Sequence, residues 1–270
     1  MARVITVTSG KGGVGKTTTT ANLGTALAMH GQRVVVVDAD IGLRNLDVVM
    51  GLENRIVYDL VDVVEGRCRL RQALIKDKRF PELFLLPAAQ TRDKDAVSAE
   101  DMIALCNDLS REFDFVLIDS PAGIEGGFRN AIAGADEVLI VTTPEVSAVR
   151  DADRIVGLVE AFDKGHPRLI LNRIRPHMVS RGDMMTTEDV VEILAIDLIG
   201  AVPDDEMIVT TTNRGDVAVM ERASKAGRAF SSIARRLLGE DVPMQVFTSD
   251  ESFLTRLWGA MGLKPRRASR

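Results

Sequence analysis

The sequence contains few residues of the kinds that build metal clusters or disulfide frameworks. Among 270 residues there are two cysteines, Cys68 and Cys106, and three histidines. The cysteines lie far apart and form no Cys-x-x-Cys pair or Cys/His cluster. A zinc or iron–sulfur site within one chain is therefore not expected. We expect both thiols to be small, partly buried groups in a reducing compartment.

The sequence also lacks a long apolar run. No stretch approaches the roughly 20 apolar residues that a membrane-spanning helix needs. A strand-like run starts at Arg3, so we expect no signal peptide, and we expect any membrane contact to be at the surface.

Positive charge is scarce in the body of the chain and gathers near its end. Residues 252–270 hold five basic residues and no acidic ones, so this tail contributes +5 to a formal net charge of −5 and the rest carries −10. An acidic body argues against broad nucleic-acid binding, and it marks the basic tail as a surface-binding element.

Strand-like and helix-like segments alternate along the chain, which predicts an α/β fold with a doubly wound, mostly parallel sheet flanked by helices. We expect residues 1–240 to form one domain, 241–251 a linker, and 252–270 a C-terminal amphipathic helix. The predicted strands are 3–8, 33–38, 83–86, 114–119, 137–142, 168–172 and 198–202. The predicted helices are 17–29, 99–113, 127–133, 147–163, 187–194 and 222–238, with weaker signals at 58–64 and 70–75.

A glycine-rich loop lies between the first predicted strand and helix. Its sequence, Gly-Lys-Gly-Gly-Val-Gly-Lys-Thr, has the spacing and the context of a loop that binds nucleoside triphosphates. Glycines let the backbone approach an anion, and N–H groups at the start of the helix then surround phosphate oxygens. We predict that Lys16 contacts the β- and γ-phosphates and that Thr17 ligates Mg²⁺. The predicted nucleotide-binding residues here are Gly10, Lys11, Gly12, Gly13, Val14, Gly15, Lys16, Thr17 and Thr18. The alternative is a turn that only connects two core elements.

Three aspartates follow predicted strands, and ligands of such sheets bind at the carboxyl ends of strands. Asp119 follows an apolar strand and is placed to hold Mg²⁺ through water. Asp38 and Asp40 end another strand on one side of the chain. We assign Asp38 to the Mg²⁺ shell and Asp40 to orienting the attacking water. The alternative for all three is that they cap turns.

Lys11 is a second lysine at the start of the loop, and its simplest interpretation is a solvated side chain. However, Lys11-Gly-Gly-Val-Gly-Lys16-Thr17 resembles the deviant Walker A signature of the ParA/MinD ATPase superfamily. In that family the early lysine reaches phosphates bound by the opposite subunit. The resemblance therefore implies an ATP-joined homodimer in which Lys11 is catalytic along with Lys16 and Asp40.

The resemblance extends along the chain. Residues 38–46 and 119–123 resemble the family's switch I and switch II, and residues 146–153 are similar to a dimer-facing helix on which Asp151 and Asp153 would contact protein partners. Asn172 and Pro203 match segments that frame adenine, which implies that Asn172 selects the base. Without the resemblance, a strand-end asparagine that satisfies local backbone is about equally credible.

The tail carries an apolar stripe when it is wound as a helix. The stripe comprises Phe253, Leu254, Leu257, Trp258 and Met261. Such a helix, about 16 Å long at 1.5 Å per residue, suits shallow insertion beside anionic headgroups. It resembles the membrane-targeting sequence of septum-placing family members, although Thr255 stands where basic residues are common. The alternative is a helix docked on the protein's own core.

The resemblance implies a peripheral-membrane ATPase that uses ATP and Mg²⁺ and moves between the cytoplasm and the inner face of the cell membrane. It would recruit a MinC-like division inhibitor and be released by a MinE-like protein. Two alternatives stay open: a ParA-type DNA-segregation ATPase, which the acidic body disfavours, and a flagellar-number regulator of the same family. Iron–sulfur reductase relatives are disfavoured because Cys68 and Cys106 lie outside the matching segments.

Overall fold

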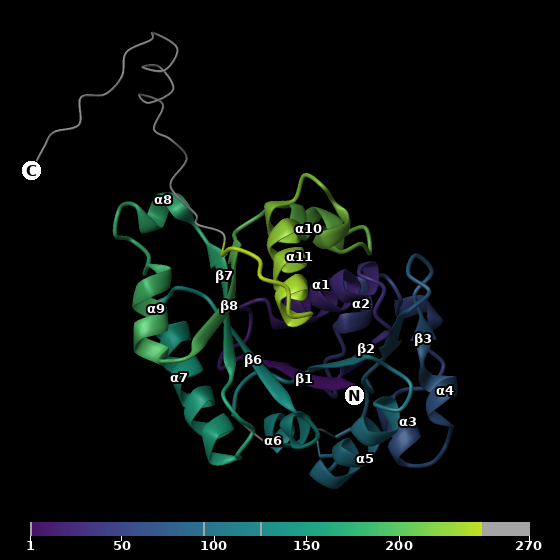
Figure 1. The fold of residues 1–270 in the computed structure, drawn as a ribbon. Coiled ribbons are helices and arrows are strands. Elements are labelled where there is room, and N and C mark those ends of the chain that lie inside the picture. The colour runs from purple at the N-terminus through teal and green to yellow at the C-terminus, as the bar shows by residue number, and fades with distance from the viewer. Residues whose placement is uncertain (1, 94, 125, 245–270) are drawn as a thin grey trace, which may run out of the picture.

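The computed structural model describes residues 2–93, 95–124 and 126–244 (Figure 1). In this part of the chain, strands form one sheet in the order β3-β4-β2-β5-β1-β6-β7-β8. Only the β3–β4 pair is antiparallel. The strands are β1 (Arg3–Thr8), β2 (Val34–Asp38), β3 (Ile75–Lys76), β4 (Leu83–Leu86), β5 (Phe115–Asp119), β6 (Glu137–Thr142), β7 (Arg168–Ile174) and β8 (Asp197–Pro203). The predicted doubly wound, mostly parallel sheet is confirmed.

Helices cover both faces of the sheet (Figure 1). They are α1 (Lys16–Met29), α2 (Leu46–Met50), α3 (Leu60–Val64), α4 (Leu70–Ala73), α5 (Ala99–Leu109), α6 (Gly126–Ala133), α7 (Val146–Ala161), α8 (Pro176–Val179), α9 (Thr187–Leu194), α10 (Met207–Thr212) and α11 (Lys225–Leu237). Short 3₁₀ turns occupy Glu53–Arg55 and Ala218–Met220.

Alternation along the strands separates the core into two layers. In β2, Val34 and Val36 pack with α1, α2 and α11 on one face. Val35 and Val37 pack with α3 and α5 on the other face. All four valines are fully buried, as is typical of a parallel strand covered by helices on both sides. On this second face, α7 and α9 continue the layer over β6 and β7.

Several predicted boundaries differ from the structure. The helix expected over 99–113 ends at Leu109, and the helix expected over 222–238 covers Lys225–Leu237. The helix expected over 70–75 ends at Ala73, because Leu74 turns extended and Ile75 pairs with Leu85 as β3. The helices α2, α8 and α10 were not predicted, because each has six residues or fewer and fewer than two turns of helix show no clear periodicity.

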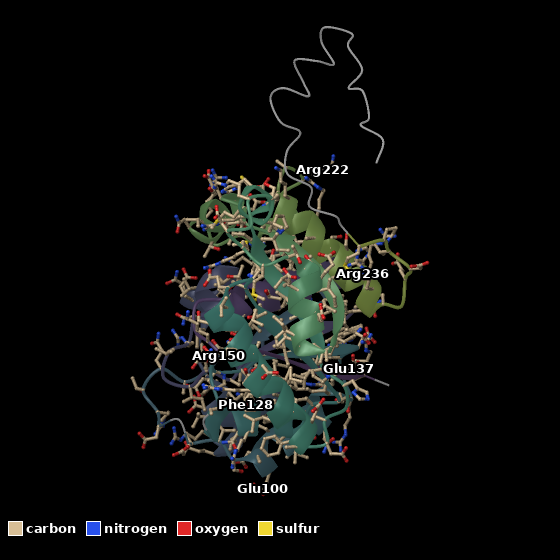
Figure 2. All side chains as sticks on the ribbon, turned by 90° about the vertical axis from the view of Figure 1, so that its left-hand side faces the viewer. Glu100, Phe128, Glu137, Arg150, Arg222 and Arg236 are labelled. Atoms are coloured by element: carbon tan, nitrogen blue, oxygen red, sulfur yellow. The ribbon has the colours of Figure 1, made fainter. Side chains whose placement is uncertain are left out.

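Charged contacts hold the amino ends of the central strands. The Glu137 carboxylate accepts hydrogen bonds from Arg3 and from Arg168, at 2.6 Å in each case, and the Arg3 guanidinium also donates to the Leu237 carbonyl. Figure 2 shows Glu137 well separated from Arg236. The Arg236 guanidinium donates to the carbonyls of Ile199, Val242 and Pro243. It thereby ties the segment after α11 to β8.

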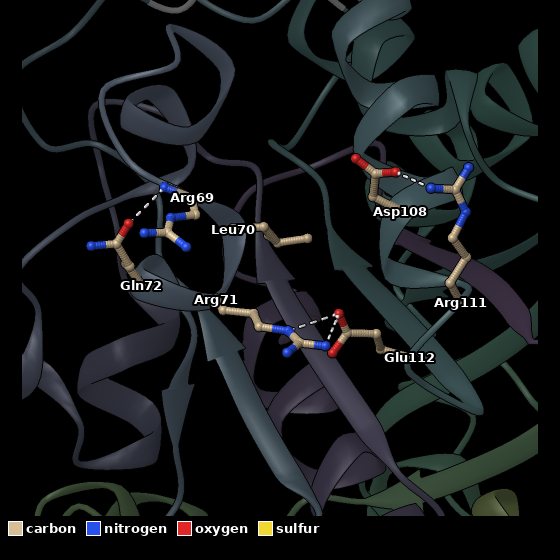
Figure 3. Close-up of a pocket in the computed structure, with 7 residues that line it drawn as sticks. All are labelled: Arg69, Leu70, Arg71, Gln72, Asp108, Arg111 and Glu112. Carbon is tan, nitrogen blue, oxygen red and sulfur yellow. Dashed lines mark hydrogen bonds and ion pairs between the residues drawn. The ribbon is translucent and has the colours of Figure 1, made fainter.

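A groove of about 510 Å³ lies between α4 and the end of α5 (Figure 3). Two of its arginines are paired at 3.0 and 2.9 Å: Arg71 with Glu112, and Arg111 with Asp108. Because α5 ends there just before β5 begins, the groove lies at the amino edge of the sheet, away from the glycine-rich loop.

No helix among the described residues is long and apolar enough to cross a membrane. The apolar stripe of Phe253, Leu254, Leu257, Trp258 and Met261 lies outside the described residues. The linker and tail assigned to 241–251 and 252–270 therefore stay predictions.

Candidate nucleotide-binding site

The glycine-rich loop connects β1 to α1 as the sequence predicts. Gly13 and Gly15 have φ of +82° and +96°, a backbone conformation that residues with a Cβ rarely adopt. Gly15 is also the residue that caps the amino end of α1. The first N–H groups of α1 therefore point toward the loop without partners from the helix itself, which suits an anion.

Two loop glycines are wedged against neighbouring elements, and two are open. A Cβ on Gly10 would lie 2.2 Å from the Asp151 carbonyl oxygen, and one on Gly15 would lie 2.3 Å from Asn172 Nδ2. Gly12 and Gly13 have nothing within 4 Å of such an atom. The loop is thus held between α7 and β7 while its middle faces open space where a phosphate can approach.

Lys16 is buried and paired with Asp119. Its Nζ donates to Asp119 Oδ1 at 2.8 Å, and the Thr20 hydroxyl donates to the same oxygen at 3.1 Å. The two side chains are 7% and 1% exposed. A buried ammonium needs a negative partner, and here Asp119 supplies it. A phosphate entering the loop would compete with Asp119 for Lys16.

Asp38 lies beside Asp119, because β2 and β5 are paired in register at these two residues. Its carboxylate is fully buried and accepts hydrogen bonds from the backbone N–H groups of Asp40, Asn45 and Leu46 at 3.0–3.1 Å. Burial, and then the negative charge of Asp119, raise the pKa of Asp38 to about 7. The pair of carboxylates is therefore short of positive charge.

These residues fit a magnesium ion. Two buried carboxylates share a single buried ammonium, and oxygen ligands are what Mg²⁺ prefers. Within the described chain the Thr17 hydroxyl makes no hydrogen bond to another residue, so it is available as a ligand. No group of three or more His, Cys, Asp or Glu side chains that could hold a metal occurs in the described residues. A site here would thus complete its shell with phosphate oxygens and water, as Mg²⁺ sites at phosphates usually do.

The two remaining predicted catalytic residues lie at the rim. Asp40 is half-buried and begins the loop between β2 and α2, next to a small cavity of about 30 Å³ that Pro121 also lines. Lys11 is exposed, and its Nζ donates to Ser147 Oγ on α7 of the same chain at 3.3 Å. The predicted reach of Lys11 into an opposite subunit stays a prediction.

Asn172 holds the loop. Its Nδ2 donates to the Val14 carbonyl at 2.8 Å, at a point where the β7–β8 register is irregular and Arg173 has a φ of +57°. Such a bulge redirects a side chain. Asn172 therefore satisfies a backbone carbonyl of the phosphate loop, which is distant in sequence. The selection of adenine by Asn172 stays a prediction.

A cavity of about 280 Å³ opens beside the loop. Thr18 and Pro203, both predicted nucleotide-binding residues, line it, and so do Gly15 and Asn172. The sequence did not indicate Ile208 and Val209, which α10 contributes to the same wall. An apolar wall next to a phosphate loop suits a flat base, and the full lining is Gly15, Thr18, Asn172, Arg173, Pro203, Asp204, Asp205, Ile208, Val209 and Phe230.

The predicted switch II segment is attached to the loop, because the Gly123 N–H donates to the Ser9 carbonyl at 3.0 Å. The predicted partner residues lie on the first turns of α7, the helix that carries Arg150 in Figure 2. Asp153 is exposed, and Asp151 Oδ1 lies 3.5 Å from Arg154 Nη1 in an ion pair. Their contacts with other proteins stay predictions.

Comparison with known proteins agrees with this site. The family described as the CobQ/CobB/MinD/ParA nucleotide binding domain matches residues 5–219. The septum site-determining protein MinD of Bacillus subtilis is 59% identical over 248 residues, which cover 91% of this chain and 92% of that protein. The chain belongs to the MinD family of nucleotide-binding proteins.

Solved MinD structures share the fold. A chain of the MinC:MinD cell division protein complex of Aquifex aeolicus superposes with a TM-score of 0.86 at 50% identity, covering 91% of this chain and all of that one. MinD of Pyrococcus horikoshii, solved with Mg-ADP, gives a TM-score of 0.80 at 30% identity and covers 90% and 100%. The identification as a nucleotide-binding member of the ParA/MinD superfamily is confirmed.

The glycine contacts predict unequal effects of adding one methyl group. Gly10→Ala places a Cβ against the backbone of α7 and should lower the free energy of unfolding by about 1–3 kcal/mol. Gly12→Ala meets open space and should change it by less than about 0.5 kcal/mol. Denaturant unfolding of the nucleotide-free variants measures both, and equal stability would contradict the wedged position of Gly10.

Proposed function

We propose that this protein is an ATP-dependent, dimerising ATPase that acts at the membrane in placing the cell-division septum. The proposal rests on the alignment with a septum site-determining relative, which is 59% identical over 91% of this chain. The buried lysine and carboxylates at the loop support the chemistry. Septum site-determining proteins of several bacteria match at 48–59% identity, so the DNA-segregation and flagellar alternatives have less support.

The geometry supports binding of a triphosphate by exchange of ionic partners. Phosphate oxygens take the place of Asp119 as the partner of Lys16, and a phosphate can approach the backbone at Gly12 and Gly13, where an added Cβ would meet no atom within 4 Å. When bound, Mg²⁺ would supply positive charge beside the phosphate oxygens. Thr17, Asp38 and Asp119 would hold it.

Hydrolysis then requires a positioned water and stabilisation of the leaving oxygens. We assign water positioning to Asp40, which borders the small cavity beside the switch II segment. Lys16 stabilises the developing charge from within the chain, and Lys11 does so from the opposite subunit.

An apolar rim supports face-to-face dimerisation. Leu43, Ile124 and Val146 are 61%, 50% and 69% exposed. Leu43 belongs to the loop after β2, Ile124 directly follows the switch II segment, and Val146 begins α7. The switch II segment and α7 contact the phosphate loop, and the loop after β2 lines a small cavity together with Pro121 of the switch II segment. Apolar side chains exposed together around a charged site are typical of an interface.

Dimerisation would set membrane residence. One short tail helix binds anionic lipid weakly, but two tails on one dimer bind by avidity, which can raise affinity by about 10²–10⁴-fold. The relative of Aquifex aeolicus solved as a MinC:MinD complex supports a MinC-like partner here. We assign contact with a MinE-like partner to α7, with Asp151 and Asp153.

Removing the Asp40 carboxylate separates binding from hydrolysis. Asp40→Ala should keep ATP-dependent dimerisation while lowering kcat by about 10²-fold or more, because the attacking water is no longer oriented. Phosphate release and light scattering with ATP measure the two properties, and Asp108→Ala on the distant groove is the matched control (Figure 3). Unchanged turnover would remove Asp40 from the mechanism.

Sedimentation with anionic vesicles tests the whole proposal. The full chain should sediment with ATP and much less with ADP, whereas deletion of residues 252–270 should abolish sedimentation and spare ATP binding. Leu257→Glu should act like the deletion, and Thr255→Ala on the polar side should not. Equal sedimentation with and without nucleotide would refute the coupling, and binding by the truncated protein would exclude the tail.

A further inference from the structure

An arginine outside the predicted site connects the end of α2 to the loop that follows α10. Arg79 lies in the turn between β3 and β4, and its guanidinium donates to three separate segments. It contacts Asp77 through Nε at 3.1 Å and Nη2 at 2.7 Å. It contacts the Met50 carbonyl at 2.8 Å, and it also contacts the Gly215 carbonyl at 2.9 Å and Asp216 Oδ1 at 2.5 Å.

Asp77 fixes the guanidinium in place. The Asp77 carboxylate is buried and also accepts hydrogen bonds from the N–H groups of Arg79 and Phe80. Burial raises the pKa of Asp77, but the hydrogen bonds and charge of Arg79 outweigh it and hold the pKa below its usual value. A bidentate, charge-assisted pair of this kind is rigid. The remaining Arg79 donors are therefore aimed at Met50 and at residues 215–216.

The Met50 contact leads to Asp38. Met50 is the last residue of α2, a helix of five residues. At the other end of the same helix, the N–H groups of Asn45 and Leu46 donate to the Asp38 carboxylate at 3.1 Å. So short a helix moves as one piece, and its position therefore sets the orientation of Asp38.

The Gly215 contact leads to the base cavity. Residues 213–216 directly follow α10, whose Ile208 and Val209 line the 280 Å³ cavity. The backbones of Gly51 and Gly215 touch, since a Cβ on Gly51 would lie 2.5 Å from the Gly215 carbonyl oxygen. No gap separates the end of α2 from this loop.

We propose that Arg79 is a positioning residue that joins α2 to the loop after α10, so that a base bound against α10 fixes α2 and thereby the Asp38 carboxylate. This inference rests on the proposed nucleotide site. Occupancy of the base cavity is then coupled to the arrangement of a residue on the phosphate side. The coupling runs through contacts between α10, residues 213–216, Arg79 and α2.

Hydrogen exchange of the full chain, read segment by segment, tests this coupling. ADP fills both the loop and the base cavity, whereas pyrophosphate fills the loop alone. Both are used with EDTA, so that no metal links Asp38 directly to a phosphate. The difference in exchange between the two ligands isolates the contribution of the nucleoside, the part of ADP that carries the base.

We expect ADP to slow exchange in residues 45–51 as well as in 207–216, relative to pyrophosphate. Arg79→Lys keeps the charge but loses the fork that reaches several acceptors. In this variant the slowing by ADP should persist in 207–216 and fall about tenfold in 45–51. Asp216→Asn removes the negative charge of one of the ion pairs of Arg79, leaves the Asp77–Arg79 pair and should weaken the coupling in the same direction. Arg111→Lys, in the turn that follows α5, is the matched control and should behave as the natural protein (Figure 3).

Two failures are distinguishable. If neither ligand slows exchange in the loop and α1, the proposed nucleotide site is wrong, and the inference falls with it. If ADP slows exchange in 207–216 but 45–51 responds equally in the natural protein, Arg79→Lys and Asp216→Asn, the site stands and the role of Arg79 is refuted. Should Arg79→Lys fail to fold, the response of Asp216→Asn decides alone.

Discussion

The site depends on one buried ammonium that two buried carboxylates share. Lys16 begins α1, and Asp38 and Asp119 end the neighbouring strands β2 and β5, so the order of strands in the sheet brings the three together. Taking charges out of water is costly unless they are paired. Lys16 satisfies Asp119 directly, while Asp38 depends on three backbone N–H groups and has a pKa raised to about 7. A divalent cation and a phosphate would together relieve this imbalance.

Each neighbouring feature serves that arrangement. Gly10 and Gly15 let α7 and β7 approach the loop closely, and Asn172 fixes the Val14 carbonyl. The switch II segment is bonded to Ser9, and the switch I segment donates its N–H groups to Asp38. Both segments are therefore attached to the site by backbone hydrogen bonds.

Much of this arrangement could be predicted from the sequence, because the informative signals are local. The glycine spacing from Gly10 to Gly15 requires backbone conformations that few residues adopt. A run such as Val34–Val37 ending in Asp38 is typical of a buried strand whose carboxyl end carries function. The strand β6 (Glu137–Thr142) and the helix α9 (Thr187–Leu194) begin and end as predicted.

What the sequence could not provide depends on contacts between distant segments. Ile208 and Val209 line the cavity beside the phosphate loop only because α10 lies next to Pro203. The helix α10 is too short to show a helical pattern of apolar residues in the sequence. The pairing of Lys16 with Asp119 and of Asn172 with Val14 joins residues more than a hundred positions apart. Arg79 is unremarkable in sequence, and its role appears only once α2 and residues 213–216 lie against it.

We propose that Lys16 exchanges Asp119 for a phosphate when a nucleotide binds. Calorimetric titration of Mg-ATP into the natural protein, Lys16→Ala and the exposed control Lys76→Ala tests this exchange. We expect binding by the natural protein and by Lys76→Ala, and a loss of about 100-fold or more in affinity for Lys16→Ala, as expected for a buried charge-assisted contact. Undiminished ATP affinity in a folded Lys16→Ala protein would contradict it.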